Sequence, residues 1–549
     1  MMVHDSAWSW QDGDLPPHMQ AFRSTGVWRD RPLGDIARDR AMSFPDATVL
    51  VGPTGKKLLE SVVADAEALA IGLFDLGLRP NDVISFQLPN WDECVVINLA
   101  AAMAGLVINP IVPIYRDEEV TQMLLGCGSK ALFLTPNFRG YDYTAMMERI
   151  SGKLPELTHQ IIVRGDGAVS YDILIAAGRG RTPNMSAVDP DRVKLLLYTS
   201  GTTGRPKAVL HNHNSMARFI DASTRNWSVA PGEGILMPSP VTHITGYSFG
   251  LEMPFLSGSQ TLLMDVWNAE LAVSLIDSHR VVGMITATPF LQELVQAAHL
   301  AETRLPSLRF FGCGGAAVPP ELIFKANRQF EQHPAFRVFG CSELPIITQG
   351  WLGVENAQLA ASTDGEIVDY DVKVVDVNGN TLPFGDEGEI LARGPSMFLG
   401  YKDPADNNEA ITSDGYFRTG DLGIITSENA LLITGRKKDI IIRGGENISA
   451  KEIEDVLHLN PDVAEVAIVS MPHPRLGEGV CAFIVPREGH NPSISDVSAF
   501  VAGQGLSRQK IPEHLVIVEA LPKTASGKIR KDVLRAQIRE IILDAAKST

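Results

Sequence analysis

The sequence predicts an α/β protein with a large N-terminal domain of parallel or mixed sheets flanked by helices, and a small C-terminal α+β domain. Its 549 residues exceed what one hydrophobic core usually organises, so at least two domains are expected. Helical and strand-like segments alternate over residues 32–192, as in parallel sheets covered on both faces. From residue 440 the pattern changes to short strands around a capped helix, which indicates a separate domain of about a hundred residues.

The alternating segments can be assigned one by one from apolar spacing. Helices are predicted over residues 62–76, 94–106 and 118–125, and strands over residues 83–88, 107–114 and 131–134. Asn214 is expected to cap a helix that ends near Arg225. The most lipid-like run, residues 94–110, contains two asparagines and falls short of the roughly 20 residues that a membrane span needs. We therefore expect a buried helix there and no transmembrane segment.

The second domain begins with a predicted strand over residues 440–442. Ser449 and Glu452 then form the two ends of a capping box, and Ile453, Val456 and Leu457 give the helix after it an apolar stripe. Strands are predicted over residues 463–469 and 480–485.

The amino-acid composition limits the kinds of molecule that the protein is expected to bind. The net charge of −17, from 48 basic and 65 acidic residues, argues against nucleic acid and anionic membranes as partners. Five widely spaced cysteines without a Cys-x-x-Cys pair suit reduced thiols and exclude a zinc knuckle or a disulfide framework. The first residues lack the basic-then-apolar order of a signal peptide, so we expect a cytoplasmic protein. The sequence leaves the oligomeric state open, including a homo-oligomer.

A loop rich in Ser, Thr and Gly follows a predicted buried strand over residues 195–198. Its glycines tolerate unusual backbone angles, so N–H groups and hydroxyls can converge with a lysine on a polyphosphate. Because Pro206 and the apolar residues 208–210 follow, we expect a returning strand there and not the helix of the usual phosphate loop. A flexible surface turn is the alternative, but such turns seldom follow a buried strand. The candidate phosphate contacts are Thr199, Ser200, Gly201, Thr202, Thr203, Gly204 and Lys207.

Residues 199–207 resemble the phosphate-loop motif of the acyl-adenylate-forming superfamily, which includes acyl-CoA synthetases, peptide-synthetase adenylation domains and firefly luciferase. Further motifs follow in that family's order, and the match runs from about Asp35 to the C-terminus. The resemblance implies the adenylate-forming enzyme fold. Its implied parts are an ATP- and acyl-binding domain over residues 1–435, a hinge over 436–439 and a mobile catalytic domain over 440–549.

Two motifs of the large domain carry further candidates. Residues 238–246 resemble the motif Pro-x-x-His-x-x-Gly, which places His243 at the acyl pocket; the residues alone do not support a role as a base. Residues 339–343 resemble Tyr-Gly-x-Thr-Glu, with Phe in place of Tyr and Ser342 in place of Thr. Glu343 then supplies an oxygen for Mg²⁺. The resemblance places Gly315, Ala316, Ala317, Phe339, Gly340 and Cys341 around the adenine ring.

Residues 312–317 also fit Gly-x-Gly-x-x-Ala after a strand, which would suggest a nicotinamide site. The two prolines at 319 and 320 interrupt the expected helix, and this fingerprint alone is weak.

The remaining motifs lie at the end of the large domain and beyond it. Asp421 matches the family's ribose-binding Asp, Arg436 its ribose- and phosphate-binding Arg, and Lys438 its hinge position. Lys528, in the closing Pro-x-x-x-Ser-Gly-Lys loop, is the first choice for the catalytic residue, with Glu343, Ser342 and His243 as the other catalytic candidates. Without the resemblance, each of these motifs is an ordinary turn or solvated loop. The turn implied to meet the thiol substrate comprises Arg443, Gly444 and Gly445.

The resemblance implies a two-step ligase that uses ATP, Mg²⁺ and CoA. A substrate carboxylate attacks the α-phosphorus of ATP to give an acyl-adenylate and pyrophosphate, and the thiol of CoA then displaces AMP. In the first step Lys528 would contact both anions and offset the charge that develops between them. Pro522, Gly527 and Lys528 also fit a pattern resembling lysine-acetylation sites of bacterial relatives, which implies a lysine acetyltransferase acting on Lys528.

The acid itself is less well defined. The candidate pocket segments, residues 243–249, 286–290 and 312–314, contain no Lys or Arg to pair a second carboxylate, which favours an apolar monocarboxylic acid. Residues 86–91 and 362–365 look most like those of cyclohexanecarboxylate–CoA ligases and bacterial short- and medium-chain fatty acyl-CoA synthetases. The alternatives are an aryl, benzoate-type CoA ligase and a stand-alone adenylation enzyme that loads a carrier-protein thiol. A luciferase-like oxygenase and a non-catalytic nucleotide-binding protein are disfavoured.

Overall fold

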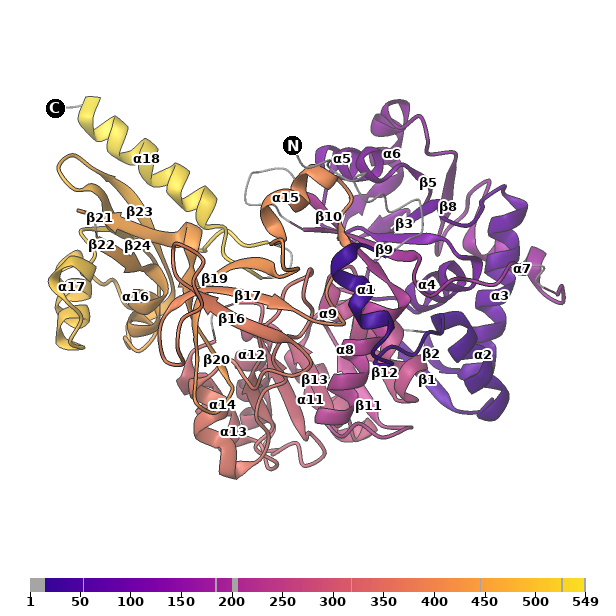
Figure 1. Cartoon of the computed structure of the whole chain (residues 1–549), viewed down its shortest axis with the longest axis horizontal. Helices are drawn as coiled ribbons and strands as arrows, with labels where there is room; N and C mark the ends of the chain where they lie inside the picture. Colours follow the sequence, from indigo (N-terminus) through magenta and orange to yellow (C-terminus); the bar gives the residue numbers. More distant parts are fainter. Residues whose placement is uncertain are drawn as a thin grey trace.

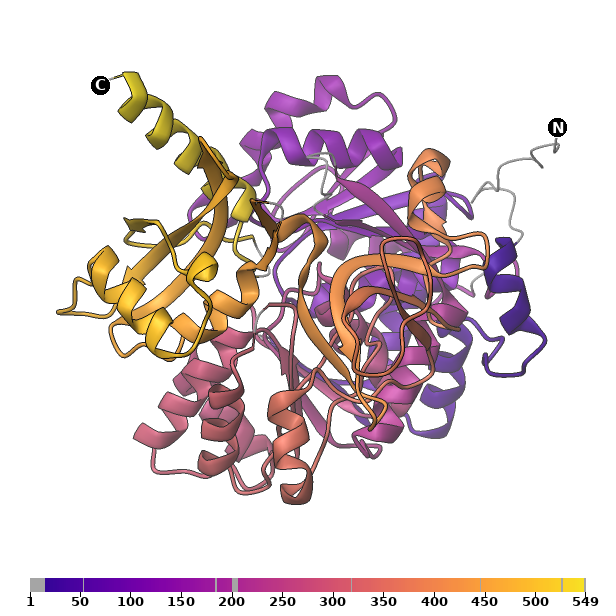
Figure 2. The same ribbon diagram turned by 60° about the vertical axis from the view of Figure 1, so that its left-hand side comes forward.

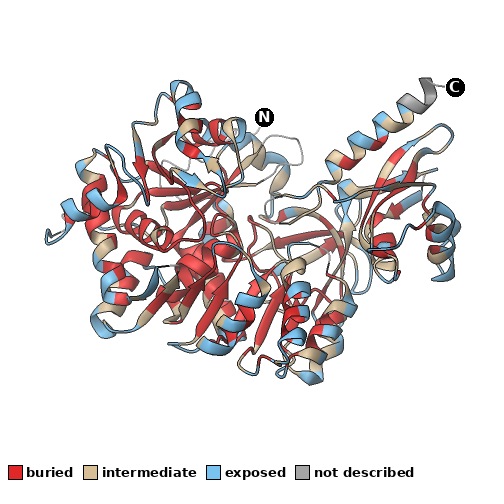
Figure 3. Cartoon of the chain, turned by 180° about the vertical axis from the view of Figure 1, so that it is seen from behind, coloured by how far each residue is buried: buried red, intermediate tan, exposed pale blue. Residues whose placement is uncertain are grey.

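The computed structural model describes residues 15–52, 54–182, 185–199, 206–316, 318–444, 446–524 and 527–547. Two seven-stranded sheets are followed along the chain by a four-stranded and then a five-stranded sheet (Figure 1). Buried strands fill the interior of the large part and helices form its outer surface (Figure 3). The predicted α/β class, with a small C-terminal α+β part, is confirmed.

The first large sheet has the strand order β18-β10-β9-β4-β3-β5-β8. Its strand β3 is buried along its whole length, as expected for a parallel strand covered on both faces. β10 runs antiparallel to β9 and to β18, whereas the pairs among the other strands are parallel. The bounds are β3 (Val83–Gln87), β4 (Val107–Pro110), β5 (Ser129–Leu134), β8 (His159–Ile162), β9 (Val193–Thr199), β10 (Lys207–Asn212) and β18 (Gly400–Tyr401).

The second large sheet has the order β15-β14-β13-β11-β12-β1-β2. All its pairs are parallel except the edge pair of β1 with β2. The bounds are β1 (Thr48–Gly52), β2 (Gly55–Leu58), β11 (Gly234–Met237), β12 (Gln260–Leu263), β13 (Gly283–Thr286), β14 (Phe310–Cys313) and β15 (Ala335–Arg337).

Helix α4 (Asp92–Ala104) lies between the two large sheets. It contacts β4 of one sheet and β1 of the other, and it also packs on α2 (Leu33–Ser43) and α3 (Leu59–Asp75). This position explains why nearly every residue of α4 is buried, and it confirms the predicted buried helix. Among the described residues, no helix combines the length and the apolar character needed to cross a bilayer.

The four-stranded antiparallel sheet has the order β16-β17-β19-β20 and lies between the large sheets and the C-terminal part (Figures 1 and 2). Its bounds are β16 (Asp371–Val375), β17 (Gly388–Arg393), β19 (Phe417–Ile425) and β20 (Leu431–Arg436). Strand β20 leads through the short 3₁₀ turn Lys437–Asp439 into the first strand of the next sheet.

The C-terminal sheet has helices on both faces. Alternate residues of β23 (Val463–His473) face opposite sides: Val466 and Ile468 pack under α16 (Ala450–Leu457) and α17 (Ile494–Gly503), whereas Ala467 and Val469 pack under α18 (Lys531–Lys547). The other strands are β21 (Ile440–Arg443), β22 (Glu446–Ser449), β24 (Gly477–Pro486) and β25 (His514–Ile517).

Two local features were not predicted from the sequence. Helix α8 (His213–Asn226) is capped by Asn212 and not by Asn214, because the Asn212 carboxamide oxygen accepts the Ser215 amide at 2.7 Å. The Asn214 side chain instead donates to Asp30 and Asp191. A second difference is the π-helix over Tyr247–Glu252, which follows the short helix Ile244–Gly246.

Candidate active site

The phosphate-loop candidates lie at the open end of a β-hairpin. Thr199 ends β9, Lys207 begins β10, and the two residues are cross-strand partners. The predicted returning strand is therefore confirmed. The hairpin opens on the side of the sheet where the parallel strands β3, β4 and β5 have their carboxyl ends. Ligands of such sheets bind beyond these strand ends. The predictions for Ser200, Gly201, Thr202, Thr203 and Gly204 lie outside the described residues.

Lys207 is held by groups from a distant part of the chain. Its amine lies 3.3 Å from a carboxylate oxygen of Asp406 and 4.9 Å from the ring centre of Tyr401. Both partners belong to the segment that pairs with β10 on its other edge. The Lys207 ammonium group thus lies beside the open end of the hairpin, where it could bind a polyphosphate.

Glu343 is a buried carboxylate with several fixed contacts. Its side chain Oε1 accepts the Tyr401 hydroxyl at 2.7 Å, and its backbone carbonyl accepts the Phe398 amide at 2.8 Å. The preceding carbonyl, of Ser342, accepts a hydrogen bond from His211 Nε2 at 2.7 Å. Burial lowers the pKa of His211 to about 4, so this ring is neutral and donates through one nitrogen only.

The donor set around Glu343 suits a magnesium ion that enters with the nucleotide. Within the part of the chain that the structure describes, no three His, Cys, Asp or Glu side chains come together as a metal site. One carboxylate alone would not hold Mg²⁺, but this ion commonly takes one or two carboxylates and completes its shell with phosphate oxygens and water. Glu343 fits that role.

The residues predicted to surround the adenine ring include two positions that favour glycine. A side-chain carbon on Gly340 would lie 2.4 Å from the Ile346 amide nitrogen, so only glycine fits there. Gly315 has φ +80°, in the left-handed region that favours glycine, and Ala316 beside it is exposed. Phe339 and Cys341 are half-buried on either side of Gly340. Ala317 lies outside the described residues.

Asp421 and Arg436 form an ion pair across the four-stranded sheet. They are cross-strand partners on β19 and β20, and Arg436 Nε donates to Asp421 Oδ1 at 2.7 Å. Burial raises the pKa of Asp421, whereas Arg436 and Lys528 oppose that shift. The carboxylate of Asp421 has a second oxygen, Oδ2, for which a ribose hydroxyl is a chemically suitable donor.

Lys528 reaches this site from the C-terminal part. Its Cε lies 3.9 Å from the position that a side-chain carbon on Gly315 would occupy. Burial and then Arg436 lower the pKa of Lys528, while Asp421 and Glu343 oppose the shift. Gly315 and Glu343 follow strands of the second large sheet, and Asp421 and Arg436 belong to the four-stranded sheet, so Lys528 lies near predicted nucleotide contacts from two sheets.

His243 lies near enough to Lys528 to be affected by its charge. It is half-buried, directly before the helix Ile244–Gly246, and burial together with Lys528 lowers its pKa to about 4. A neutral imidazole next to an ammonium can accept a hydrogen bond or line a pocket, but it is a weak base at neutral pH.

Lys438 lies at the margin of this group, in the turn after β20. Partial burial and then Arg436 lower the pKa of Lys438, and its charge helps to oppose the raised pKa of Asp421. The candidates in the C-terminal sheet lie apart from this group. Arg443 forms an ion pair with Glu513 within the C-terminal sheet, and Gly444 donates its amide to Leu476. Gly445 lies outside the described residues. The turn after β21 therefore faces its own sheet in this structure.

The sequence analysis missed Tyr401 and His211, which contact the candidate residues directly. Their hydrogen-bond partners are 58 and 131 positions away in the chain. No local pattern marks either residue, because the contacts depend on the pairing of β10 with β18 and on the approach of the loop after β15.

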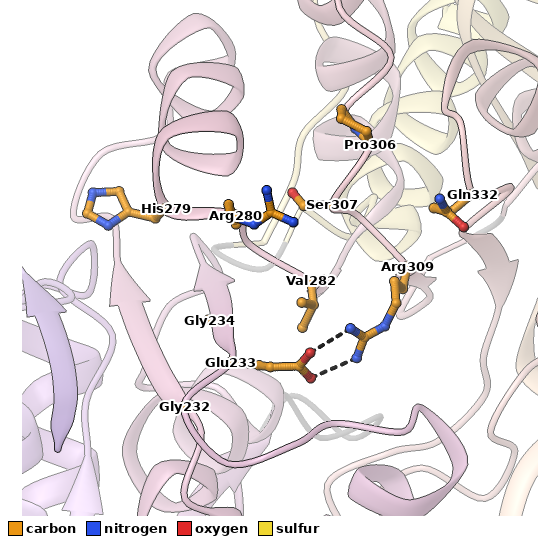
Figure 4. A pocket seen from close by; sticks show the side chains of 10 residues that line it. All are labelled: Gly232, Glu233, Gly234, His279, Arg280, Val282, Pro306, Ser307, Arg309 and Gln332. Atoms are coloured by element: carbon orange, nitrogen blue, oxygen red, sulfur yellow. Dashed lines mark hydrogen bonds and ion pairs between the residues drawn. The ribbon is translucent and has the colours of Figure 1, made fainter.

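A separate cavity of about 460 Å³ lies on the other side of the second large sheet from the candidate site, where its strands begin (Figure 4). It is lined by the amino-terminal ends of β11 and β13 and by the loop before β14. Its Glu233 accepts two hydrogen bonds from Arg309, at 2.6 and 2.7 Å, so these charges neutralise each other. None of the candidate site residues lines it.

Comparisons with known proteins show which family the chain resembles. Residues 37–402 match the family model of the AMP-binding enzymes, and residues 452–528 match that of the AMP-binding enzyme C-terminal domain. The medium-chain fatty-acid–CoA ligase of Escherichia coli (strain K12) is 33% identical over 527 residues, covering 94% of this chain and 92% of that relative.

Two further comparisons extend the similarity to other relatives. The 2,3-dihydroxybenzoate-AMP ligase of Bacillus subtilis (strain 168) is 28% identical and covers 96% of this chain and 97% of its own length. The crystal structure of ATP-bound MatB from Rhodopseudomonas palustris has a TM-score of 0.84 at 25% identity, covering 93% of this chain and 99% of that chain. The similarity thus extends over both parts of the fold and to ligases of fatty and of aromatic acids.

Proposed function

This chain belongs to the AMP-binding enzymes, as an AMP-forming acid–thiol ligase, and we propose that it activates an apolar monocarboxylic acid. The resemblance to the acyl-adenylate-forming superfamily is confirmed. Enzymes of this kind use ATP and CoA. In the proposed reaction the acid and ATP give acyl-AMP and pyrophosphate, and CoA then takes the acyl group and releases AMP.

The observation that carries the assignment of residues is the meeting of Lys528 with Glu343, Asp421 and Gly315. These residues come from segments that lie far apart in the sequence. Lys528 lies beside Gly315, and the charges of Asp421 and Glu343 act on its amine. Burial and the second cation, Arg436, lower the pKa of Lys528, and groups with such perturbed pKa values are concentrated at functional sites.

In the first half-reaction two anions must approach each other. Lys207 and the hairpin of β9 and β10 would hold the outer phosphates, and Asp421 with Arg436 would hold the ribose. Mg²⁺ on Glu343 and the phosphates would supply positive charge for the leaving pyrophosphate. Lys528 would bind the acid carboxylate and the α-phosphate together, so that it orients them and stabilises the negative charge of the transition state.

The second half-reaction requires a different set of contacts. We propose the division into residues 1–435, a hinge over 436–439 and a mobile domain over 440–549. Rotation about Lys438 would withdraw Lys528 and bring Arg443, Gly444 and Gly445 to the acyl-adenylate. The short 3₁₀ turn Lys437–Asp439, with its exposed Lys438, joins the two parts of the chain and is the place where we propose the rotation.

The choice of acid rests on charge. Residues 243–249 and 286–290, which flank the site near His243, contain no Lys or Arg that could pair a second carboxylate. The E. coli relative is a medium-chain fatty-acid–CoA ligase, which supports a fatty or alicyclic monoacid. The B. subtilis relative acts on 2,3-dihydroxybenzoate, so an aromatic acid is the second candidate.

A panel of acids tests the proposal. Purified enzyme with ATP and Mg²⁺ is assayed for AMP release with medium-chain, cyclohexane and benzoate-type acids, each with and without CoA. We expect AMP release that depends on CoA and is fastest with an apolar monoacid. Faster turnover with dicarboxylic or dihydroxybenzoic acids would contradict the substrate class, and acyl transfer to a carrier protein in preference to CoA would contradict the acceptor.

A further inference from the structure

Tyr401 links two parts of the candidate site that the sequence keeps far apart. Its hydroxyl donates to Glu343 Oε1 at 2.7 Å, and the Lys207 amine lies over its ring at 4.9 Å from the ring centre. The side chain is only 5% exposed, so water does not compete freely for either contact. One residue therefore touches both the cation at the phosphate hairpin and the carboxylate that fits a metal.

The position of Tyr401 is fixed by its backbone. It pairs with Val209 on β10, its amide donates to Asn407 at 2.8 Å, and its ring packs edge-on against Phe398 at 5.0 Å. β10 is the strand that Lys207 begins. Tyr401 and Lys207 are thus mounted on neighbouring strands of one sheet, whereas Glu343 lies on a separate loop.

We propose that Tyr401 is a positioning residue that fixes Glu343 relative to the phosphate hairpin and so prepares the site for a metal–nucleotide complex. The orientation of a buried carboxylate depends on the hydrogen-bond donors around it. The rigid phenol of Tyr401 gives Glu343 Oε1 one donor in a fixed position. A tyrosine hydroxyl carries its proton at neutral pH, so it is the donor to the carboxylate. This inference rests on the proposed role of Glu343 as the metal carboxylate.

The ring and the hydroxyl have separable effects. Tyr401→Phe removes the hydroxyl but leaves the ring under Lys207, so it should disturb Glu343 alone. Tyr401→Leu removes the ring face as well, so Lys207 should lose its orientation toward the phosphates. The two variants therefore distinguish the metal side of the site from the phosphate side.

The test measures binding and not turnover. Isothermal titration gives the affinity for metal-free ATP in EDTA, and the electron paramagnetic resonance signal of Mn²⁺ gives the affinity for the Mn²⁺–ATP complex. Tyr401→Phe should weaken Mn²⁺–ATP binding by about ten- to a hundredfold, the usual effect of losing a hydrogen bond to a charged group, and leave metal-free ATP within about twofold. Tyr401→Leu should weaken both.

Tyr416→Phe is a matched control. Tyr416 is also buried, its hydroxyl donates to the carboxylate of Asp371 at 2.5 Å, and Lys373 lies 3.9 Å from its ring centre. Tyr416 thus repeats the arrangement of a buried tyrosine, a carboxylate and a lysine, but its carboxylate is not the proposed metal ligand. This variant should leave both affinities unchanged.

A double-mutant cycle with Glu343→Gln shows whether Tyr401 acts through Glu343. If it does, Tyr401→Phe adds little to the loss already caused by Glu343→Gln. Unchanged Mn²⁺–ATP binding in Tyr401→Phe, or equal losses with and without metal, would overturn the inference. If Glu343→Gln itself leaves Mn²⁺–ATP binding unchanged, the metal role in the proposed function fails, and the inference fails with it. A failure of Tyr401→Phe alone leaves the proposed function intact.

Discussion

At the scale of single residues, the site is a set of charges that compensate one another without a ligand. Asp421 neutralises Arg436, and Asp406 lies next to Lys207. Lys528 is the exception, because burial and Arg436 both act against its charge. An anionic substrate would restore the balance at Lys528, which makes it the residue with the clearest experimental signature.

Lys528→Gln should separate the two half-reactions. Without the ammonium group the transition state of adenylation loses one stabilising contact, which typically costs about 10²–10³ in rate. Thioester formation from supplied acyl-AMP and CoA should remain within about threefold, because the proposed second step does not use this side chain. Pyrophosphate exchange measures the first step and CoA consumption the second. Equal losses in both steps would contradict the assignment.

The pH dependence of adenylation gives a second signature. Adenylation requires charged Lys528, and burial and Arg436 lower its pKa, so the rate should begin to fall at a pH below the ordinary lysine pKa of about 10.4. Lys528→Arg keeps a charge at every accessible pH, so this alkaline limb should disappear even though the rate is lower. Pyrophosphate exchange is measured from neutral pH upward. An alkaline limb that stays in place in Lys528→Arg would assign it to another group.

At the scale of elements, the strand that leads into the phosphate hairpin is joined to the segment that follows His243. Lys194 of β9 forms an ion pair with Glu252, the last residue of the π-helix Tyr247–Glu252, and each side chain is 2% exposed. The Lys194 amine also lies 5.9 Å from the ring centre of Tyr247. π-Helical turns occur frequently at functional sites, and here the ion pair links the last residue of this one to β9.

Removing one partner of this pair should be costly. Lys194→Met leaves Glu252 buried without a counter-charge, which typically destabilises a protein by about 3–5 kcal/mol. Lys194→Met combined with Glu252→Leu should recover most of that loss, because it removes both charges. Urea unfolding followed by tryptophan fluorescence compares the variants. A double variant as unstable as the single one would show that packing, and not charge, is responsible.

Elements formed by local signals could be predicted, and those formed by distant contacts could not. Pro206 and the apolar residues after it gave the returning strand correctly, because proline at that position opposes a helix. The cap of α8 was assigned two residues too late, since Asn212 and Asn214 have equal capping propensity and only the fold decides between them. The π-helix and the roles of Tyr401 and His211 have no local sequence signal.

At the scale of the whole molecule, the orientation of the C-terminal part is held by contacts at the proposed hinge. Arg535 of α18 forms an ion pair with Asp439 at 2.9 Å, and Ser449 Oγ donates to the Thr434 carbonyl at 2.7 Å. Both contacts exist in the same structure in which Lys528 lies at the nucleotide side of the site. They stabilise the orientation proposed for adenylation.

Arg535→Ala should shift the balance between the two orientations. Loss of this partly buried pair should lower the rate of adenylation by about fivefold at most and leave thioester formation from acyl-AMP unchanged or faster. Arg539→Ala, an exposed arginine one turn later on α18, is the control. An equal loss in both half-reactions, or the same loss in the control, would contradict a role for Arg535 in orientation.

The pairing of β10 with β18 has a consequence for synthesis of the chain. β10 ends at Asn212, but its outer partner, Gly400–Tyr401, emerges from the ribosome almost two hundred residues later. Until then the outer edge of β10, with the apolar residues Val209 and Leu210, has unpaired backbone groups that could recruit a strand of another nascent chain. Fragments that stop short of residue 400 should therefore aggregate, whereas those that include it should remain dispersed.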